Sequence, residues 1–390
     1  MFITDHIKYV GVVDRDLDLF ESQYPVPDGV TYNSYVIMDE KIAVMDTVDA
    51  RATDRWLDNL EKALAGRKPD YLVVSHMEPD HGANVAKFAG LYPEAVIVGN
   101  AKTFPMIHQF FHGNLEGRTL MVKEGDTLSL GDHTLRFFMA PMVHWPEVMV
   151  TYEEWEKILF SADGFGTFGA DSGLKEQWTQ EAARYYLNIV GKYGVQVQAL
   201  LKKAAGLDIQ MICPLHGPVL REDLGFYLDK YQTWSAYKPE VSGVLIACAS
   251  IHGNTMAAAK ELAGMLKDRG EEHVEVMDLA RTDVSYGVRK AFCYDRVVLA
   301  CATYDGGLFP CMESFLAHLK SKNYQKRTVA LVENGTWAPG AAKLMRGILE
   351  GMKEVTVAEP TVTIRSAVDD KARQVMESLA DSLVSPAGQE

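Results

Sequence analysis

The sequence contains few cysteines, and none of them has the spacing of a disulfide or metal site. The five cysteines are scattered over the second half of the chain without a Cys-x-x-Cys pair: Cys213, Cys248, Cys293, Cys301 and Cys311. An odd number of dispersed thiols is typical of a reducing compartment and predicts no disulfide framework. The pattern also excludes an iron centre with four cysteine ligands in this chain.

Long apolar runs are absent as well. No stretch of eighteen apolar residues that could cross a membrane occurs in the sequence. The first residues, Met1 to Lys8, lack the basic start and the apolar core of a secretory signal. We therefore expect a cytoplasmic protein with no membrane partner.

Positive charge is scarce: 39 Lys and Arg stand against 53 Asp and Glu, which gives a formal net charge of −14. Nucleic-acid binding needs clustered Lys and Arg to neutralise phosphates, so no nucleic-acid partner is expected. A protein partner or a small substrate fits the charge better. The 390 residues, 47% of them hydrophobic, are enough for two globular domains that each bury a core.

The most informative stretch is an apolar segment that opens into a dense group of potential metal ligands. Residues Tyr71 to Val74 have the length and β-branched content of a buried strand, and Ala83 to Ala89 read as the start of a helix. Residues 76 to 81 therefore lie on the connecting loop, where functional side chains are common. The candidate ligands in this loop are His76, Glu78, Asp80 and His81.

Imidazole and carboxylate groups together bind first-row metal ions. A closed structural zinc site needs four ligands, usually including cysteine, and this loop has no cysteine. The number of ligands instead indicates two metal ions. The alternative is a polar loop whose histidines are satisfied by hydrogen bonds.

Three further candidates each stand where a later apolar run gives way to a loop: His144, Asp163 and His216. Because the same pattern recurs behind the first loop, we expect a shared site. His108 and His112 are four residues apart on a predicted helix, but no Glu follows His108 as in a zincin motif, so we interpret them as a surface or half-buried pair. His133, in a Gly-Asp-His turn, is interpreted as a hairpin residue.

This set of seven side chains resembles the ligand set of flavodiiron proteins, the A-type flavoproteins built on a metallo-β-lactamase-like αββα domain. Related hydrolases commonly carry His at the position of Glu78. A carboxylate there adds a hard anionic oxygen, which suits oxidised iron better than a zinc hydrolase site. The resemblance implies one iron held by His76, Glu78 and His144, the other by Asp80, His81 and His216, and a bridge at Asp163.

Beyond the polar junction Tyr237 to Glu240, the pattern changes to alternating strands and helices. A strand at Val244 to Ala249 leads into a loop of small and polar residues, and an Ala-rich helix follows at Met256 to Leu266. Such a loop offers backbone N–H groups, hydroxyls and a positive helix end to a phosphate. Flavodoxins bind the FMN phosphate in this way, and the two following strand ends resemble flavodoxin loops that hold the isoalloxazine ring.

Three loops after three neighbouring parallel strands can meet at one flavin. The expected FMN-binding residues are Ser250, Ile251, His252, Gly253, Asn254 and Thr255 in the first loop, Thr303, Tyr304, Asp305, Gly306, Gly307 and Leu308 in the second, and Asn334, Gly335, Thr336, Trp337 and Ala338 in the third. Trp337 is a candidate for stacking on the ring; packing within the protein is the alternative.

The resemblance covers essentially the whole chain and implies a diiron domain at 1–238 and a flavodoxin-like, doubly wound FMN domain at 241–390. It also implies an oxidoreductase that reduces dioxygen to water, nitric oxide to nitrous oxide, or both, at two iron ions per subunit supplied with electrons by FMN. The expected assembly is a head-to-tail homodimer or a dimer of such dimers. The electron donor is expected to be separate: rubredoxin, a flavin reductase system or a reduced deazaflavin cofactor.

Two other interpretations stay open at this point. A binuclear zinc hydrolase of the metallo-β-lactamase superfamily would use the same loop, with the flavodoxin module appended. A non-catalytic electron carrier would use the second half alone. The proton donors are also open: Trp145, Tyr185 and Tyr186 are candidates by position only. Many members of the family carry His where this chain has Glu21, which leaves the preference between O₂ and NO undecided.

Overall fold

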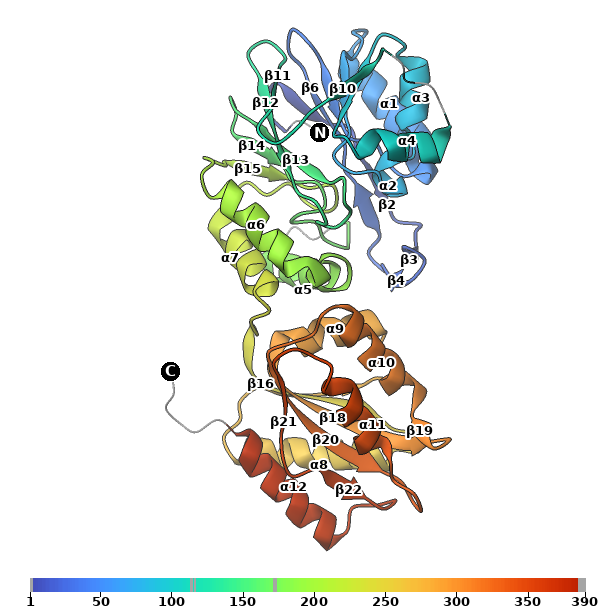
Figure 1. The fold of residues 1–390 in the computed structure, drawn as a ribbon, viewed down its shortest axis with the longest axis vertical. Coiled ribbons are helices and arrows are strands. Elements are labelled where there is room, and N and C mark those ends of the chain that lie inside the picture. The colour runs from blue at the N-terminus through green and yellow to red at the C-terminus, as the bar shows by residue number, and fades with distance from the viewer. Residues whose placement is uncertain (1–2, 113–114, 116, 171–173, 385–390) are drawn as a thin grey trace. The chain divides into compact units, whose positions relative to one another are not determined.

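The computed structural model describes residues 3–112, 115, 117–170 and 174–384, and the chain separates into two compact units, Met1–Gln232 and Thr233–Glu390 (Figure 1). The division falls inside helix α7 (Leu224–Ser235), shortly before the polar junction at Tyr237 to Glu240. Each unit has its own sheets and its own core, and each is described separately below.

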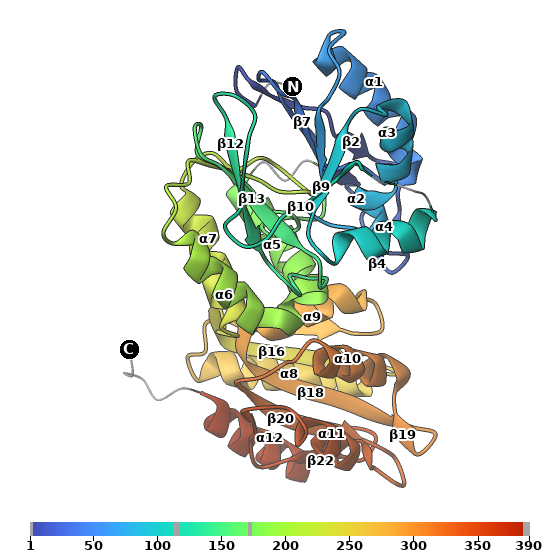
Figure 2. The ribbon, with the colours of Figure 1, turned by 45° about the horizontal axis from the view of Figure 1, so that its top comes forward.

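Unit 1, residues 1–232, is the αββα sandwich that the sequence predicted. Within the described residues, one sheet has the strand order β1-β6-β7-β8-β9-β10 and the other β11-β12-β13-β14-β15. Helices α1, α3 and α4 cover the outside of the first sheet, and α5, α6 and α7 cover the outside of the second (Figures 1 and 2). The first sheet and its helices consist of β1 (Ile7–Tyr9), β6 (Tyr35–Ile37), β7 (Ala43–Met45), α1 (Thr53–Leu64), β8 (Tyr71–Val73), α2 (Pro79–Gly82), α3 (Val85–Leu91), β9 (Val96–Gly99), α4 (Thr103–Phe111) and β10 (Thr119–Met121).

The second sheet follows in the chain, and two small ribbons stand apart from both sheets. The sheet and its helices consist of β11 (Thr127–Ser129), β12 (Thr134–Met139), β13 (Met149–Glu153), β14 (Ile158–Phe160), α5 (Lys175–Tyr185), a π-helical turn (Tyr186–Val190), a 3₁₀ turn (Gly191–Tyr193), α6 (Gly194–Ala204), β15 (Met211–Cys213) and α7. The ribbons pair β2 (Val12–Asp14) with β5 (Val30–Tyr32) and β3 (Leu19–Phe20) with β4 (Tyr24–Pro25), and a 3₁₀ turn spans Ala50–Ala52.

The inner faces of the two sheets are apolar and bury each other. Met45 and Val73 from the first sheet share one cluster with Phe137, Ile158 and Phe160 from the second, and all five are nearly inaccessible to water. Burial of apolar area contributes about 25 cal/mol per Å². This shared core fixes the two sheets face to face and thereby brings their strand ends to one edge.

The β-like run Ile7 to Val13 does not form one strand. The structure breaks this run into β1, which pairs with β6, and β2, which pairs with β5. Gly11 lies at the break, where a Cβ atom would stand 2.4 Å from the carbonyl oxygen of Tyr32. The close approach of the two backbones therefore excludes a larger side chain and redirects the chain.

Unit 2, residues 233–390, contains a parallel sheet with the order β17-β16-β18-β20-β21 in its described residues, and β22 continues beside β20. The order 2-1-3-4-5 is that of the flavodoxin-like doubly wound fold, so this part of the prediction is also confirmed. Helices α8 and α12 pack on one face (Figure 2). The elements are β16 (Val241–Ala249), α8 (Asn254–Asp268), β17 (Val274–Asp278), α9 (Val284–Cys293), β18 (Tyr294–Tyr304), β19 (Gly307–Leu308), α10 (Pro310–Ser321), β20 (Arg327–Asn334), α11 (Ala341–Leu349), β21 (Val355–Val357), β22 (Val362–Ile364) and α12 (Asp370–Leu383).

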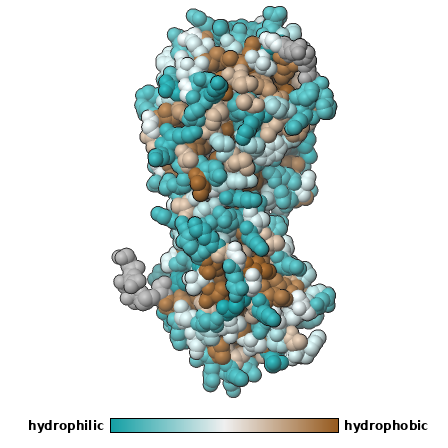
Figure 3. Space-filling model, viewed as in Figure 1, coloured by the Kyte–Doolittle hydropathy of each residue, from teal (hydrophilic) through white to brown (hydrophobic). Residues whose placement is uncertain are grey.

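No helix among the described residues is both long enough and apolar enough to pass through a bilayer. On the face shown in Figure 3, polar residues are spread over both units, with apolar residues exposed among them.

The buried guanidinium of Arg327 connects separate backbone segments near the start of the unit 2 sheet. It donates hydrogen bonds to the backbone carbonyl oxygens of Tyr237, Phe292 and Tyr294. Arg327 is 3% exposed. A planar group with five donors can serve several carbonyls at once, which a lysine ammonium at the same place cannot do.

We expect Arg327→Lys to destabilise unit 2 by about 1.5–3 kcal/mol, because carbonyl groups buried by the fold lose charged donors. Urea denaturation followed by far-UV circular dichroism measures the change. Arg365→Lys, at an exposed position, is the matched control and should leave the midpoint unchanged. Equal midpoints for the two variants would contradict the assigned role.

Candidate metal centre and cofactor site

The ligand loop after β8 is partly helical rather than fully extended between the strand and the next helix. Pro79 begins the short helix α2, which ends at Gly82. Proline is favoured at the first helical position because its missing N–H would have no partner there. Gly82 packs against the turn, since a Cβ atom would stand 2.9 Å from the Met77 carbonyl oxygen. The prediction that residues 76 to 81 all lie on a loop is therefore wrong for residues 79 to 81, which belong to α2.

Four of the predicted ligands form a first group. The Nε2 atom of His144 lies 3.0 Å from Glu78 Oε2 and 3.1 Å from Asp163 Oδ2. His76 Nε2 lies 3.3 Å from Glu78 Oε2 and 3.4 Å from Asp163 Oδ2. Metal–ligand bonds of about 2.0–2.2 Å at tetrahedral angles would separate ligand atoms by about 3.3–3.6 Å, so these spacings are close to those around a single metal ion.

The remaining three ligands form a second group on the other side of Asp163. His216 Nε2 lies 3.0 Å from His81 Nε2 and 3.1 Å from Asp80 Oδ2. His81 Nε2 is 3.3 Å from Asp163 Oδ1. The two oxygens of one carboxylate thus face different groups. The seven side chains thus form the two groups that the family resemblance implied, with Asp163 between them.

The chemistry of this cluster fits two metal ions. Both carboxylate oxygens of Asp80 and Asp163 and the Nε2 atom of His144 are buried without a hydrogen-bond partner. Burial of an ionised carboxylate is costly unless a cation or hydrogen bonds compensate it. Two imidazole nitrogens that face each other at 3.0 Å, as in the second group, likewise need a cation or a shared proton between them.

Two contacts outside the cluster hold the imidazoles in the tautomer that a metal requires. Glu147 Oε1 accepts from His76 Nδ1 at 2.7 Å and from the Met77 amide at 2.9 Å, while the backbone oxygen of Thr31 accepts from His216 Nδ1 at 2.6 Å. Each bond leaves the Nε2 lone pair for a metal. Sequence reasoning missed Glu147; its place three residues after His144, in the same loop, was the available signal.

The electrostatics of the metal-free cluster follow from this geometry. Burial alone would lower the pKa of His144, but the neighbouring carboxylates of Asp163 and Glu78 raise it to about 9. Burial would raise the pKa of Glu78, yet His144 and His76 lower it to about 2. The same histidines, with His81, hold the pKa of Asp163 well below its ordinary value against burial. Protons on the imidazoles therefore substitute for cations.

Three aromatic residues were candidates for proton donors by position. The ring of Trp145 lies 5.3 Å from that of His76, and the buried ring of Tyr185 lies 5.6 Å from that of His216. Burial, followed by repulsion from Asp163, raises the pKa of Tyr185 well above its ordinary value. Tyr186 instead packs at 5.1 Å from the ring of Tyr231.

Glu21, where many relatives carry His, lies at the tip of the ribbon between β3 and β4. Partial burial of its carboxylate and repulsion by Glu78 raise the pKa of Glu21. The charge of His144 lowers the pKa of this carboxyl group, and the charge of Asp80 raises it. Glu21 therefore interacts electrostatically with residues of the candidate metal centre.

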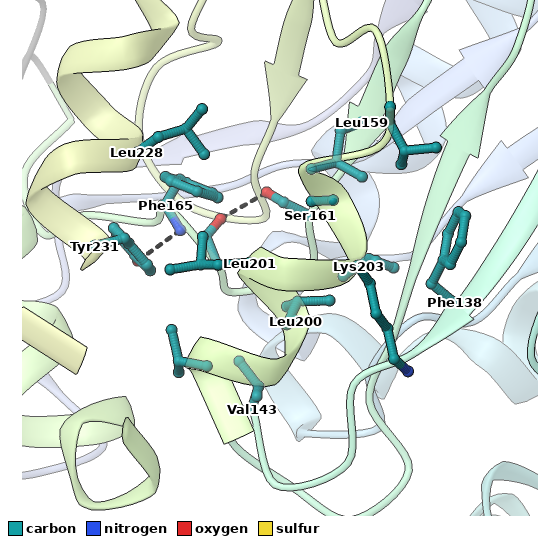
Figure 4. Close-up of a pocket in the computed structure, with 15 residues that line it drawn as sticks. Phe138, Val143, Leu159, Ser161, Phe165, Leu200, Leu201, Lys203, Leu228 and Tyr231 are labelled. Atoms are coloured by element: carbon teal, nitrogen blue, oxygen red, sulfur yellow. Dashed lines mark hydrogen bonds between the residues drawn. The ribbon is translucent and has the colours of Figure 1, made fainter. Parts of the chain in front are cut away.

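The loop that carries Asp163 rests on apolar support from α6 and α7 (Figure 4). A cavity of about 20 Å³ lies there, lined among others by Val143, Phe165 and Leu201. The ring of Phe165 stacks on Tyr231 at 4.1 Å, and its amide donates to the Tyr231 hydroxyl. None of the seven candidate ligands lines this cavity, so it belongs to the packing behind the loop.

Unit 2 has a much larger cavity, about 590 Å³, where the loops after β16, β18 and β20 meet. This volume is in the range of small-molecule sites. Gly253, with φ of +94°, precedes the first turn of α8, whose leading N–H groups point out of the helix. Trp337 is 87% exposed and lines the cavity. The lining residues are Ser250, Ile251, His252, Asn254, Thr255, Ala302, Thr303, Tyr304, Asp305, Gly306, Asn334, Gly335, Thr336, Trp337, Ala338 and Ser366.

Most of the predicted cofactor residues thus share one cavity. Gly253, Gly307 and Leu308 are not among its lining residues, while Ala302 and Ser366 line it without having been predicted. Ser366 is held there by hydrogen bonds with Asn334, 32 positions away in the chain. Such a contribution from a distant segment leaves no signal in the local pattern.

This chain is similar to several known proteins. The family model described as ODP family beta lactamase matches residues 30–217. The rubredoxin-oxygen oxidoreductase of Megalodesulfovibrio gigas is 30% identical over 361 residues, 90% of this chain and 89% of that protein. The nitric oxide reductase of Moorella thermoacetica is 29% identical over 375 residues, 93% of this chain and 92% of that protein.

A solved structure, that of the flavodiiron protein from Giardia intestinalis, superposes with a TM-score of 0.90 at 24% identity and covers 98% of this chain and 95% of its own. The chain belongs to the flavodiiron protein family. The resemblance drawn from the sequence motifs is therefore confirmed at the level of family and fold.

In this flavodiiron protein, we expect Glu147→Gln to reduce metal affinity by about 10–100-fold, as loss of a carboxylate behind a ligating histidine typically does. Equilibrium dialysis against a graded chelator, followed by metal analysis, measures the loss. Glu154→Gln removes a carboxylate that pairs with Arg136 at the surface and is the control. Equal retention of metal by both variants would show that Glu147 does not support the site.

Removal of metal should also give the protein a defined pH dependence. The folded-state pKa of His144, about 9, exceeds the ordinary value of 6.5. The stability that this proton contributes is complete below pH 6.5 and is lost as the pH rises through about 9. The Tm of chelator-treated protein should therefore fall across this window, and His144→Gln should flatten the fall. A Tm that rises with pH in this window would contradict the prediction.

Proposed function

We propose that this chain reduces dioxygen to water, nitric oxide to nitrous oxide, or both, at a non-haem diiron centre that FMN supplies with electrons. The observation that carries the proposal is the position of Asp163, whose two oxygens face two separate groups of imidazoles and carboxylates. Relatives named nitric oxide reductase and rubredoxin-oxygen oxidoreductase, matched over about nine-tenths of the chain, support the assignment to an oxidoreductase.

In this proposal, His76, Glu78 and His144 would hold one iron, Asp80, His81 and His216 would hold the other, and Asp163, with one oxygen toward each group, would be shared by both. When bound, two ferrous ions reloaded by FMN supply the electrons and the Lewis acidity for the reaction. The protein keeps protons on the Nδ1 atoms of His76 and His216 through Glu147 and Thr31, so the Nε2 atoms stay available. The three carboxylates of Glu78, Asp80 and Asp163 would offset three of the four positive charges of two ferrous ions.

The unit 2 cavity is the proposed FMN site. The loop from Ser250 to Thr255 offers hydroxyls and the N-terminus of α8 to the phosphate. Trp337, exposed beside the cavity, is placed to cover an aromatic ring system. The predicted contribution of Gly253 here is conformational, since its positive φ is accessible to glycine at little cost.

We also propose that the chain forms a homodimer and receives its electrons from a separate donor. A head-to-tail homodimer, alone or as a dimer of dimers, would bring the FMN of one subunit beside the irons of its partner. A separate donor, such as rubredoxin, a flavin reductase system or a reduced deazaflavin cofactor, would reduce the FMN. A cytoplasmic location remains a prediction from the sequence.

A zinc hydrolase is the weaker candidate. It would account for the seven converging side chains, but hydrolysis transfers no electrons and would give an appended flavin module at the unit 2 cavity no part in the reaction. The carboxylate of Glu78, in a position that is commonly His in hydrolases, also favours iron over zinc.

We expect the purified protein to contain about two iron ions and about one FMN per chain, as a two-metal site with a flavin implies. Asp163→Ala should remove most of the gas reduction and part of the iron while the flavin spectrum stays unchanged, because unit 2 is not altered. Asp208→Ala, which removes surface contacts with Lys157 and Gln210, should keep both. Zinc with hydrolase activity and no flavin would falsify the proposal.

A further inference from the structure

A second cluster of metal-ligating side chains lies in unit 1, and it shares no residue with the diiron ligands. It consists of His6, which precedes β1, His133, in the turn between β11 and β12, and Glu156, in the turn between β13 and β14. One ligand atom from each residue lies within 4.8 Å of the others. We propose that these three side chains bind a divalent transition-metal ion, with zinc as the best match.

The two clusters lie at opposite ends of the second sheet. His133 immediately precedes β12 and Glu156 closely precedes β14, whereas the diiron ligands His144 and Asp163 follow those same strands. Because β12 and β14 run the length of the sheet, the new cluster belongs to the other edge of the sandwich. A metal bound there would not be a third member of the diiron centre.

His133 is already oriented as a ligand. Its side chain is fully buried, and one oxygen of Asp39 accepts hydrogen bonds from both its backbone amide and its Nδ1 atom, each at 2.7 Å. With Nδ1 donating, Nε2 carries the lone pair. This Nε2 has no hydrogen-bond partner among the described residues and lies 3.5 Å from Glu156 Oε1. A carboxylate behind a histidine in this manner fixes the tautomer that metals bind.

Glu156 is held in place by its own turn. Both oxygens of the buried Glu153 accept backbone N–H groups, one from Trp155 and one from Glu156. The third ligand, His6, brings Nδ1 to 2.8 Å from Glu156 Oε1. The indole of Trp155 packs against both imidazoles, with ring centroids 4.9 Å from His6 and 4.7 Å from His133. Three segments distant in sequence are thus preorganised around one point.

The ligand set selects the class of metal. Two imidazoles and one carboxylate, with a fourth position left to water, are a common set for zinc. Imidazole-rich sites also suit iron, copper and nickel, whereas magnesium and calcium prefer oxygen ligands. The side chain of His6 is 45% exposed, which leaves an entry path for the ion.

An ion pair between His6 and Glu156 alone would explain less of this geometry than a bound metal ion. A hydrogen bond between His6 and Glu156 would satisfy those two groups and leave the buried Nε2 of His133 without a partner. A cation between the three satisfies all of them. It would also link the segment before the edge strand β1 of the first sheet to two turns of the second.

The test uses the full-length protein loaded with iron and FMN. Zn²⁺ is titrated by calorimetry while bound iron is measured in parallel, and Co²⁺ is titrated with visible absorption as a readout of tetrahedral nitrogen ligation. We expect about one Zn²⁺ per chain beyond the iron, retention of all iron, and an upward shift of Tm on zinc addition.

His133→Gln and, independently, the surface variant His6→Gln should each weaken this zinc affinity at least tenfold while iron content and gas reduction stay unchanged. His108→Gln, an exposed histidine outside the cluster, is the matched control and should bind zinc like the wild type. The inference is overturned by an absence of zinc uptake beyond the iron, or by equal zinc affinity in His6→Gln and His108→Gln. Since it does not depend on the diiron proposal, it stands or falls separately from iron content and activity.

Discussion

The structure of unit 1 depends on how the carboxylate of Asp163 is compensated. It is 1% exposed and has no ordinary hydrogen-bond donors; instead, each of its oxygens faces imidazole nitrogens on a different side. An uncompensated charge in that position would cost several kcal/mol. The sheets, loops and outer hydrogen bonds are arranged so that positive charge, as protons or as metal ions, is always available there. Protonation and metal binding are therefore alternative ways to stabilise the same interior, and the protein is expected to exchange one for the other.

The sandwich makes this compensation possible because it brings separate strand ends to one edge. The apolar core between the sheets aligns β8 of the first sheet with β12, β14 and β15 of the second. Each strand then carries its candidate ligands in the loop that follows it. At the opposite end of the second sheet, the turns before the strands bring His133 beside Glu156. The scaffold thus places two clusters of potential ligands, one rich in carboxylates and divided into two groups, the other small and partly open.

Unit 2 follows an equivalent rule for a different kind of ligand. Its parallel strands end at one edge, and the loops beyond them form a cavity instead of a cluster of charges. A helix N-terminus and hydroxyl groups suit a phosphate, and an exposed indole suits an aromatic ring. The two units therefore divide the chemistry of a flavodiiron protein: compensated charge for metals in the first and a preformed cavity for a flavin in the second.

The sequence by itself determined the two-part organisation, the fold of each part and the family, because the ligand motif around His76 and the loops after the unit 2 strands are local patterns with a direct chemical meaning. It also predicted the seven side chains that meet in unit 1, since each follows an apolar run. The tertiary structure alone decided which groups surround them. Glu147, Ser366 and the pairing of His133 with Glu156 and His6 depend on segments brought together from far along the chain. His133 lies in the hairpin turn that the sequence predicted, but only the position of Asp39 shows that its Nε2 atom faces Glu156. A local pattern records what one segment can form, whereas the surroundings of a side chain are set by the packing of distant segments.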